Sequence, residues 1–289
     1  MTIGFIGLGV MGEPMCRNLV HKQAQEVLAW DRQLAPLERL AEHGVRPASG
    51  IAEIARTASV VFLSLPSGKQ VEEVCLGENG LLSHIQPGHV VVDLSTTPVR
   101  LSRHLAEEFA RKSAGFIDAP IARTRQAAED GTLSIMVGAS AAQFMMLKPL
   151  LACMASDITH CGDVGTGQIA KIMNNMVLIQ TVVALAEALE TAKHAGMDGK
   201  ILFETLSKGS ADSFALRNHG MKSLLPGDFP LRAFSAEYAL KDLRYALELA
   251  AENGLHLRGA PLAAKILDET IAAGHGQLYW PVLGRMIGG

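Results

Sequence analysis

Aromatic residues make up only 5% of this 289-residue sequence, and its 4 cysteines are far apart, with no C-x-x-C pair. Isolated cysteines argue against a disulfide framework and indicate a protein of a reducing compartment. Neither sign of charge dominates, because 26 Lys and Arg stand against 29 Asp and Glu, a formal net charge of −3, and no basic cluster forms a stripe. These absences argue against nucleic acid or an anionic membrane as a partner.

Metal ligands and export signals are also missing from the sequence. The 10 histidines include no H-E-x-x-H pair, so no metal site is predicted. The N-terminus enters an apolar run directly, without the basic region and small-residue cleavage site of a signal peptide. The most apolar long stretch, 176–192, is interrupted by Gln180, Glu187 and Glu190, which is typical of a buried helix rather than a membrane span. We therefore expect a cytoplasmic protein.

The first 32 residues have the order strand, glycine turn, helix, strand and carboxylate. An apolar run at 2–6 leads into Gly-Leu-Gly-Val-Met-Gly at 7–12, then a helical segment, then a second apolar run that ends on Asp31. This order is the dinucleotide-binding fingerprint, in which the glycines admit the pyrophosphate and the helix N-terminus attracts it. The cofactor-binding residues predicted here are Gly7, Gly9, Val10, Met11, Gly12 and Asp31.

Asp31 also bears on which dinucleotide binds. A carboxylate at this position accepts hydrogen bonds from the ribose hydroxyls and repels a 2′-phosphate, which favours NAD over NADP. Arg32 follows directly and could pair with a phosphate, so NADP stays an alternative. The competing interpretation of the whole stretch is a glycine-rich turn with no ligand.

Strands and helices continue to alternate to about residue 160. The patterns predict helices at 34–43, 68–75 and up to 112, and strands at 59–65, 89–94, 116–118 and 133–137. Such alternation predicts an α/β domain, a Rossmann-type parallel sheet with its ligand at the carboxyl ends of the strands. Leu65 and Thr96, in the loops after two of these strands, are therefore predicted to contact the cofactor. The competing interpretation of Ser95 and Thr96 is that their hydroxyls cap the following helix.

The character of the sequence changes near Gly162–Gly167. After these glycines the strand-like runs stop, and helices are predicted at 168–195, 198–208, 237–253 and 261–273. We therefore expect a Rossmann domain at 1–163, followed by an all-α domain at 164–289 that a long interdomain helix begins.

Lys171 is the strongest candidate for chemistry. It lies one turn into the predicted long helix, within an apolar and amide run, and the i to i+4 spacing places Asn175 on the same face, with Asn174 beside it. Lysines in dry surroundings have a lowered pKa and can exchange a proton near neutral pH, which reduction of a carbonyl by hydride requires. The competing interpretation is a solvated surface lysine.

The chain resembles the β-hydroxyacid dehydrogenase family. That family includes 3-hydroxyisobutyrate dehydrogenase, tartronate semialdehyde reductase and sulfolactaldehyde reductase, and it is related to 6-phosphogluconate dehydrogenase. The resemblance covers nearly the whole chain. It rests on segments in the family's order and spacing at 4–12, 93–96, 118–120 with 131–138, 165–175 and 241–243.

The resemblance implies roles for several residues. Lys171 would be the catalytic acid/base, with Asn175 assisting it and Asn174 close to the substrate. Thr96 would contact the nicotinamide end of the cofactor, and Lys241 would close over the cofactor. The competing interpretation of Lys241 and Asp242 is an exposed helical charge pair. A small acidic aldehyde or hydroxy acid would be the substrate, and the protein would be a homodimer or homotetramer.

One segment departs from the family pattern. After Asp-Ala-Pro the common family sequence is a small residue followed by Ser-Gly-Gly, whereas Ile121-Ala122-Arg123-Thr124 stands here. Arginine makes bidentate contacts with carboxylates, sulfonates and phosphates. The Arg-Thr pair resembles the sulfolactaldehyde reductase branch, which predicts that Arg123 and Thr124 bind the substrate's anion. The alternative is that Arg123 or its neighbour Arg125 is a solvated loop charge.

The predicted function is that of an NAD-dependent oxidoreductase that interconverts a small β-hydroxy acid and its semialdehyde. A sulfolactaldehyde-type reductase, with Arg123 binding a sulfonate, is the alternative within the family. Two rivals come from other classes. Imine reductases have a similar layout but lack the lysine, and non-catalytic relatives lose it as well, so Lys171 argues against both.

Overall fold

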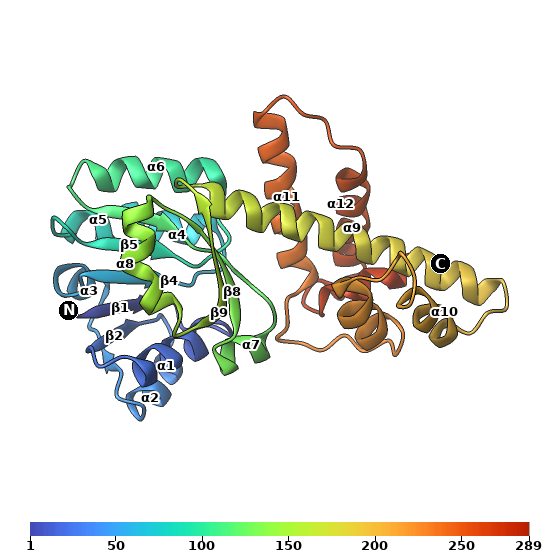
Figure 1. Cartoon of the computed structure of the whole chain (residues 1–289), viewed down its shortest axis with the longest axis horizontal. Helices are drawn as coiled ribbons and strands as arrows, with labels where there is room; N and C mark the ends of the chain where they lie inside the picture. Colours follow the sequence, from blue (N-terminus) through green and yellow to red (C-terminus); the bar gives the residue numbers. More distant parts are fainter. Residues whose placement is uncertain (289) are drawn as a thin grey trace. The chain divides into compact units, whose positions relative to one another are not determined.

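The structure, a computed structural model, describes residues 1–288 (Figure 1). It divides into two compact units, Met1–Lys171 and Ile172–Gly289, which we call the sheet unit and the helical unit. The division falls inside the long helix α9 (Thr166–His194), whereas the sequence pattern placed the boundary between residues 163 and 164.

The sheet unit is built on one nine-stranded sheet. Its strands are β1 (Ile3–Ile6), β2 (Val27–Trp30), β3 (Arg46–Pro47), β4 (Val60–Leu63), β5 (Val90–Asp93), β6 (Gly115–Asp118), β7 (Ile121–Ala122), β8 (Leu133–Gly138) and β9 (Ala155–Gly162). The strand order is β3-β2-β1-β4-β5-β6-β8-β7, with β9 paired to β8. Along the sheet, the strands β3-β2-β1-β4-β5-β6 all pair in parallel, so the predicted Rossmann-type fold class is confirmed.

Helices cover both faces of this sheet. They are α1 (Gly12–Lys22), α2 (Leu34–Ala41), α3 (Ile51–Thr57), α4 (Gly68–Leu76), α5 (Leu81–His84), α6 (Val99–Ala110), α7 (Arg125–Asp130) and α8 (Ala141–Leu151). Successive strand residues point to opposite faces. On β4, for example, Phe62 packs in a core with Met15 and Leu19 of α1, while Val61 packs in a second core with Phe109 of α6. Burial on both faces explains why these strands are continuous apolar runs.

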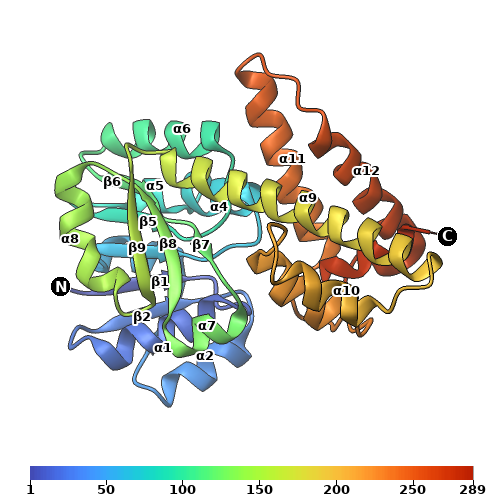
Figure 2. The same ribbon diagram turned by 45° about the vertical axis from the view of Figure 1, so that its right-hand side comes forward.

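The far edge of the sheet differs from a purely parallel arrangement. Strand β8 runs antiparallel to β6 and β7 and parallel to β9, which lies beside it in Figure 2. The sequence patterns predicted neither β7 nor β9. Five of the eight residues of β9 are polar or glycine, and most of its residues are exposed or half-buried, so an apolar periodicity could not reveal this strand.

Helices joined by turns make up the helical unit within residues 172–288. Besides the greater part of α9, its elements are α10 (Gly199–Leu206), η1 (Leu216–Leu224), α11 (Ala236–Glu252), α12 (Gly259–Thr270), η2 (Ile271–His275) and η3 (Trp280–Met286). Helices α11 and α12 lie side by side (Figures 1 and 2). Trp280, fully buried, packs in the core with Ile179 of α9 and Leu243 of α11. The predicted all-α character is confirmed.

Helix α9 is long and apolar enough to cross a membrane by length and composition, and 39% of its most apolar window is buried inside the protein. Its apolar side chains serve the core of the helical unit, to which it contributes Ile179, Val182 and Leu189.

Candidate cofactor and substrate site

The glycine turn after β1 has the shape that a pyrophosphate requires. Gly7 has φ +93°, and a Cβ there would collide with the carbonyl oxygen of Ser64. A Cβ at Gly12 would collide with the carbonyl oxygen of Gly7, so the start of α1 packs directly on the turn. The missing Cβ of Gly9, by contrast, faces open space, and Val10 beside it is 46% exposed. The turn is therefore closed toward the protein and open where phosphates would approach the helix N-terminus.

Asp31 lies against this turn. Its Oδ2 accepts a hydrogen bond from the Leu8 amide at 2.6 Å, and its Oδ1 accepts one from the Gln33 amide at 2.8 Å. The carboxylate is thus fixed beside the glycines, where it can accept from ribose hydroxyls. Arg32 instead forms an exposed ion pair with Glu73 of α4, at 3.1 Å. These residues fit a dinucleotide.

The loops after β4 and β5 are joined through hydroxyl groups. Ser95 Oγ accepts from the Leu65 amide at 2.9 Å, Asp93 accepts from the Ser95 amide at 2.9 Å, and Thr97 Oγ1 donates to Asp93 Oδ2 at 2.6 Å. Thr96 is half-buried between two buried neighbours. The N-cap of α6 is Pro98, whose side chain has no hydrogen-bonding atom. The hydroxyls of Ser95 and Thr97 therefore brace the loops.

Two buried residues that the sequence analysis did not single out hold the start of α9. Asp118, at the end of β6, accepts from the Gly165 amide at 2.6 Å and from the Gln168 amide at 2.7 Å. The side chain of Gln168 donates to the Ser95 carbonyl at 2.8 Å and accepts from the Thr97 amide at 3.0 Å. Burial raises the pKa of Asp118 to about 6, although the backbone amides oppose this rise. Together they tie the first turn of α9 to the Thr96 loop.

Helix α9 carries all three residues that the sequence pattern placed on it. Lys171 is half-buried, and Asn175 follows one turn later and is buried. Asn175 Nδ2 donates to Asp242 Oδ2 at 2.6 Å, and its Oδ1 accepts from Asn174 Nδ2 at 3.0 Å. These two bonds fix the orientation of the Asn175 amide, so one Nδ2 proton and one Oδ1 lone pair remain for a ligand.

Lys241 belongs to the same polar group of the helical unit. Its Nζ forms an ion pair with Asp242 Oδ1 at 3.1 Å and lies 5.4 Å from the ring centroids of Tyr238 and Tyr245. The Lys241 side chain is 22% exposed and that of Asp242 only 1%. The interpretation of this pair as an exposed helical charge pair is therefore wrong, because its carboxylate is buried and also holds Asn175. Sequence reasoning named Asp242 only as a partner of Lys241, because only the tertiary fold brings it to Asn175.

Arg123 occupies an unusual backbone position, with φ +88° at a non-glycine residue. Its Nη1 donates to the Thr132 carbonyl at 2.6 Å and to Ser156 Oγ at 2.8 Å, and its Nη2 donates to Asp157 Oδ2 at 2.6 Å. Thr124 is the N-cap of α7, its Oγ1 accepting from the Ala127 amide at 3.4 Å. Arg125 pairs with Glu129 within that helix. The guanidinium of Arg123 is thus held by the strands β8 and β9.

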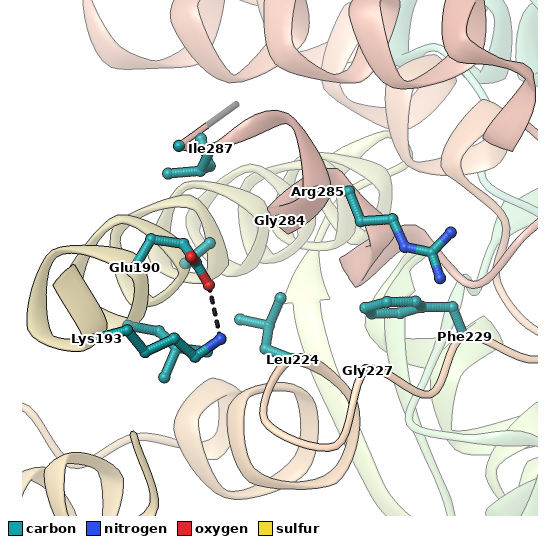
Figure 3. A pocket seen from close by; sticks show the side chains of 11 residues that line it. Glu190, Lys193, Leu224, Gly227, Phe229, Gly284, Arg285 and Ile287 are labelled. Carbon is teal, nitrogen blue, oxygen red and sulfur yellow. Dashed lines mark hydrogen bonds and ion pairs between the residues drawn. The ribbon is translucent and has the colours of Figure 1, made fainter. Parts of the chain in front are cut away.

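A pocket of about 330 Å³ lies in the helical unit, between the second half of α9, the end of η1 and the C-terminal segment (Figure 3). On one side of the pocket, Glu190 and Lys193 of α9 form an ion pair at 2.7 Å. The guanidinium of Arg285 lies over the ring of Phe229. Its lining, taken over residues 1–288, includes none of the predicted cofactor or substrate residues. Across the same residues, no group of three or more His, Cys, Asp or Glu could hold a metal ion.

The Rossmann-type sheet, the open glycine turn and the fixed Asp31 carboxylate define a dinucleotide-binding protein of the Rossmann type. Residues 2–162 match the family model of the NAD binding domain of 6-phosphogluconate dehydrogenase. Residues 165–278 match that of the NAD-binding region of NADP-dependent 3-hydroxyisobutyrate dehydrogenase. The chain belongs to the β-hydroxyacid dehydrogenase family, an NAD(P)-dependent family of oxidoreductases. The predicted family, enzyme class and dinucleotide cofactor are confirmed.

Individual relatives are similar to this chain over nearly its full length. The 2-(hydroxymethyl)glutarate dehydrogenase of Eubacterium barkeri is 36% identical over 96% of this chain and 91% of its own length. A Dictyostelium discoideum protein named "Probable 3-hydroxyisobutyrate dehydrogenase, mitochondrial" is 34% identical over 98% and 89%. The structure of 3-hydroxyisobutyrate dehydrogenase from Mycobacterium tuberculosis, solved with L-serine, superposes with a TM-score of 0.90 at 30% identity, covering 99% of this chain and 98% of that one.

Proposed function

We propose that this protein interconverts a small β-hydroxy acid and its semialdehyde, with NAD as the preferred cofactor and Lys171 as the general acid/base. The observation that carries the proposal is the arrangement on α9, where Lys171 is followed one turn later by an Asn175 whose amide Asp242 and Asn174 hold in place. The relatives named for 3-hydroxyisobutyrate and 2-(hydroxymethyl)glutarate, and the M. tuberculosis relative solved with L-serine, support a small hydroxy acid as the substrate class.

The residues divide the chemistry between them. The bound dinucleotide supplies a hydride acceptor or donor. In oxidation, the amine of Lys171 takes the proton of the substrate hydroxyl as hydride leaves the same carbon, and in reduction its ammonium returns that proton to the carbonyl oxygen. Asn175, already oriented, donates its remaining Nδ2 proton to the substrate oxygen and so steadies the charge that develops there. Asn174 and Lys241 complete the polar surroundings.

The acidic end of the substrate is assigned to the Arg123 and Thr124 loop. An arginine where the family pattern has glycine adds a cation that suits a carboxylate or a sulfonate. A sulfonated aldehyde is therefore the alternative substrate. The family resemblance also supports a cytoplasmic homodimer or homotetramer, which light scattering on the purified protein would test.

The test of the proposal is NADH oxidation with tartronate semialdehyde, methylmalonate semialdehyde, succinic semialdehyde and sulfolactaldehyde. We expect Lys171→Met to lower kcat with the best of these by about 10²- to 10⁴-fold, because the proton donor is lost. Binding of NADH, followed by its fluorescence, should be unchanged. Lys193→Met is the matched control, since Lys193 lies on the same helix and pairs only with Glu190 in a surface ion pair.

Two results would overturn this proposal. If Lys171→Met and Lys193→Met retain equal activity, Lys171 is not the acid/base. If the wild-type protein binds NADH but reduces none of the four aldehydes and oxidises none of the corresponding hydroxy acids, the non-catalytic alternative takes its place.

A further inference from the structure

Arg123 is held by segments that are far from it in the sequence. Its guanidinium spans the Thr132 carbonyl, just before β8, and the Ser156 and Asp157 side chains near the start of β9. Ser156 Oγ also donates to Asp157 Oδ2 at 2.7 Å, so the carboxylate is itself oriented toward the arginine. Of the five N–H donors of a guanidinium, three take part in these bonds, and Nε–H and one Nη2–H remain.

The backbone at Arg123 is strained, and its partners stabilise the strain. A side chain at φ +88° is unfavourable, and such a conformation persists only where the surrounding structure holds it. The bonds of the Arg123 side chain to β9 and to the Thr132 carbonyl provide that support. Of these partners, Asp157 forms an ion pair with the guanidinium as well as a hydrogen bond, so its removal should change both the position and the charge balance of the guanidinium.

The ion pair between Arg123 and Asp157 is accessible to water and to other anions. The Arg123 side chain is 40% exposed and that of Asp157 is 57% exposed. Exposed ion pairs contribute little net stability, because water competes for both charges. Serine and arginine hydrogen bonds lower the pKa of Asp157, so its carboxylate is ionised throughout the neutral range. An incoming anion therefore meets an arginine that a fixed carboxylate already neutralises.

We propose that Asp157 is a positioning residue that sets the anion specificity of the Arg123 loop, by holding the guanidinium and competing with the acidic group of the substrate for it. The inference rests on the proposed function, in which Arg123 binds that acidic group. Because Asp157 already pairs with Arg123, an anion must bind more strongly to reach the guanidinium. A simple anion such as chloride should displace it less readily than a substrate that is also held by its reacting end.

The experiment compares wild type, Asp157→Asn, Arg123→Gly and the double variant, using the best substrate of the aldehyde panel. Asparagine keeps the shape and the acceptor oxygen of Asp157 but removes its charge. We expect KM for the acidic aldehyde to fall about two- to fivefold in Asp157→Asn, the range of an exposed ion pair, with kcat within twofold of wild type. Methanesulfonate, an unreactive anionic probe, should inhibit this variant at correspondingly lower concentration. Glu78→Gln, which removes one exposed charge elsewhere in the sheet unit, should change neither value.

The double variant shows whether the change in KM caused by Asp157→Asn depends on Arg123. If Asp157 acts through Arg123, the gain in affinity disappears in the Arg123→Gly background. An unchanged KM in Asp157→Asn, or a gain that persists without Arg123, overturns the inference. A rise in KM that Arg123→Gly reproduces also overturns it, because Asp157 would then only support the loop. Failure of the proposed function is a separate outcome. Without any turnover, methanesulfonate would still protect Asp157→Asn against thermal unfolding at lower concentration than it protects the wild type.

Discussion

Asp31 and Arg32 are the two residues that we expect to set the preference between NAD and NADP. Asp31 is fixed beside the glycine turn by two backbone amides, and Arg32 forms an ion pair with Glu73 instead. The sequence analysis left Arg32 open as a phosphate partner, because the identity of its neighbour on α4 depends on the fold. The structure favours the carboxylate as the group that a ribose meets.

We expect the wild-type protein to use NADH in preference to NADPH, and Asp31→Asn to shift the ratio of kcat/KM values toward NADPH by about tenfold. Asparagine still accepts from the Leu8 amide but no longer repels a 2′-phosphate, and charges in partial contact with water are worth on the order of 1 kcal/mol. Steady-state kinetics with both cofactors measures the ratio. Arg32→Gln serves as the comparison. If it lowers NADPH use more than Asp31→Asn raises it, Arg32 is the residue that reads the cofactor.

At the scale of elements, the strands with apolar runs were predictable and the polar ones were not. The runs at β1, β4 and β5 are buried on both faces, and hydrophobic patterning alone locates them. Strand β9 is polar because it lies at the edge, and its partner β8 is what makes it a strand. The start of α9 was likewise only partly predictable from the sequence. Its glycines were visible in the sequence, but Asp118, which accepts two of its amides, is about fifty residues away.

In the candidate site, the motif residues could be recognised from the sequence, but the contacts that position them could not. Gly7, Lys171 and Asn175 stand in recognisable local patterns. Gln168, Asp118 and Asp242 act through long-range hydrogen bonds, and no local spacing predicts these contacts, even though Asp118 and Asp242 lie in segments that resemble the family. Arg123 was recognisable as a departure from the family, yet its partner Asp157 was not, because β9 itself was not predicted.

Gln168 offers a test at this scale, because it joins α9 to the loop that carries Thr96. We expect Gln168→Met to lower the free energy of unfolding by about 2 kcal/mol, since the Ser95 carbonyl and the Thr97 amide lose their buried partners. KM for NADH should rise more than kcat falls, because the displaced loop belongs to the cofactor side. Urea unfolding and steady-state kinetics measure the two effects. Gln180→Met, whose side chain donates to the Met176 carbonyl of its own helix, is the control and should cost less than about 0.5 kcal/mol. Equal effects of both substitutions would show that Gln168 has no special role.

At the scale of the whole molecule, the two units carry buried groups that respond to acid in opposite directions. In the helical unit, burial lowers the pKa of His219 to about 4, helped by the charge of Lys222, and its Nδ1 bonds the Tyr279 hydroxyl at 2.7 Å. In the sheet unit, burial raises the pKa of Asp118 to about 6. Unfolded histidine and aspartate titrate near 6.5 and 3.9. Between pH 6.5 and 4.5 the unfolded helical unit therefore binds more protons than the native one, while for the sheet unit the native state binds more.

Acidification from pH 6.5 to 4.5 should consequently weaken the helical unit and strengthen the sheet unit, each by about 2 kcal/mol from these groups. The two tryptophans allow each unit to be followed separately, because Trp30 lies on β2 and Trp280 begins η3. In the Trp30→Phe variant, the urea midpoint of the Trp280 fluorescence should fall on acidification. In Trp280→Phe, the midpoint of the Trp30 signal should hold or rise. His219→Asn keeps an acceptor for Tyr279 but no titrating ring, so it should remove most of the fall in the Trp280 signal. A fall of the same size in that variant would mean that other groups set the acid response, and coincident midpoints at both pH values would mean that the units unfold as one.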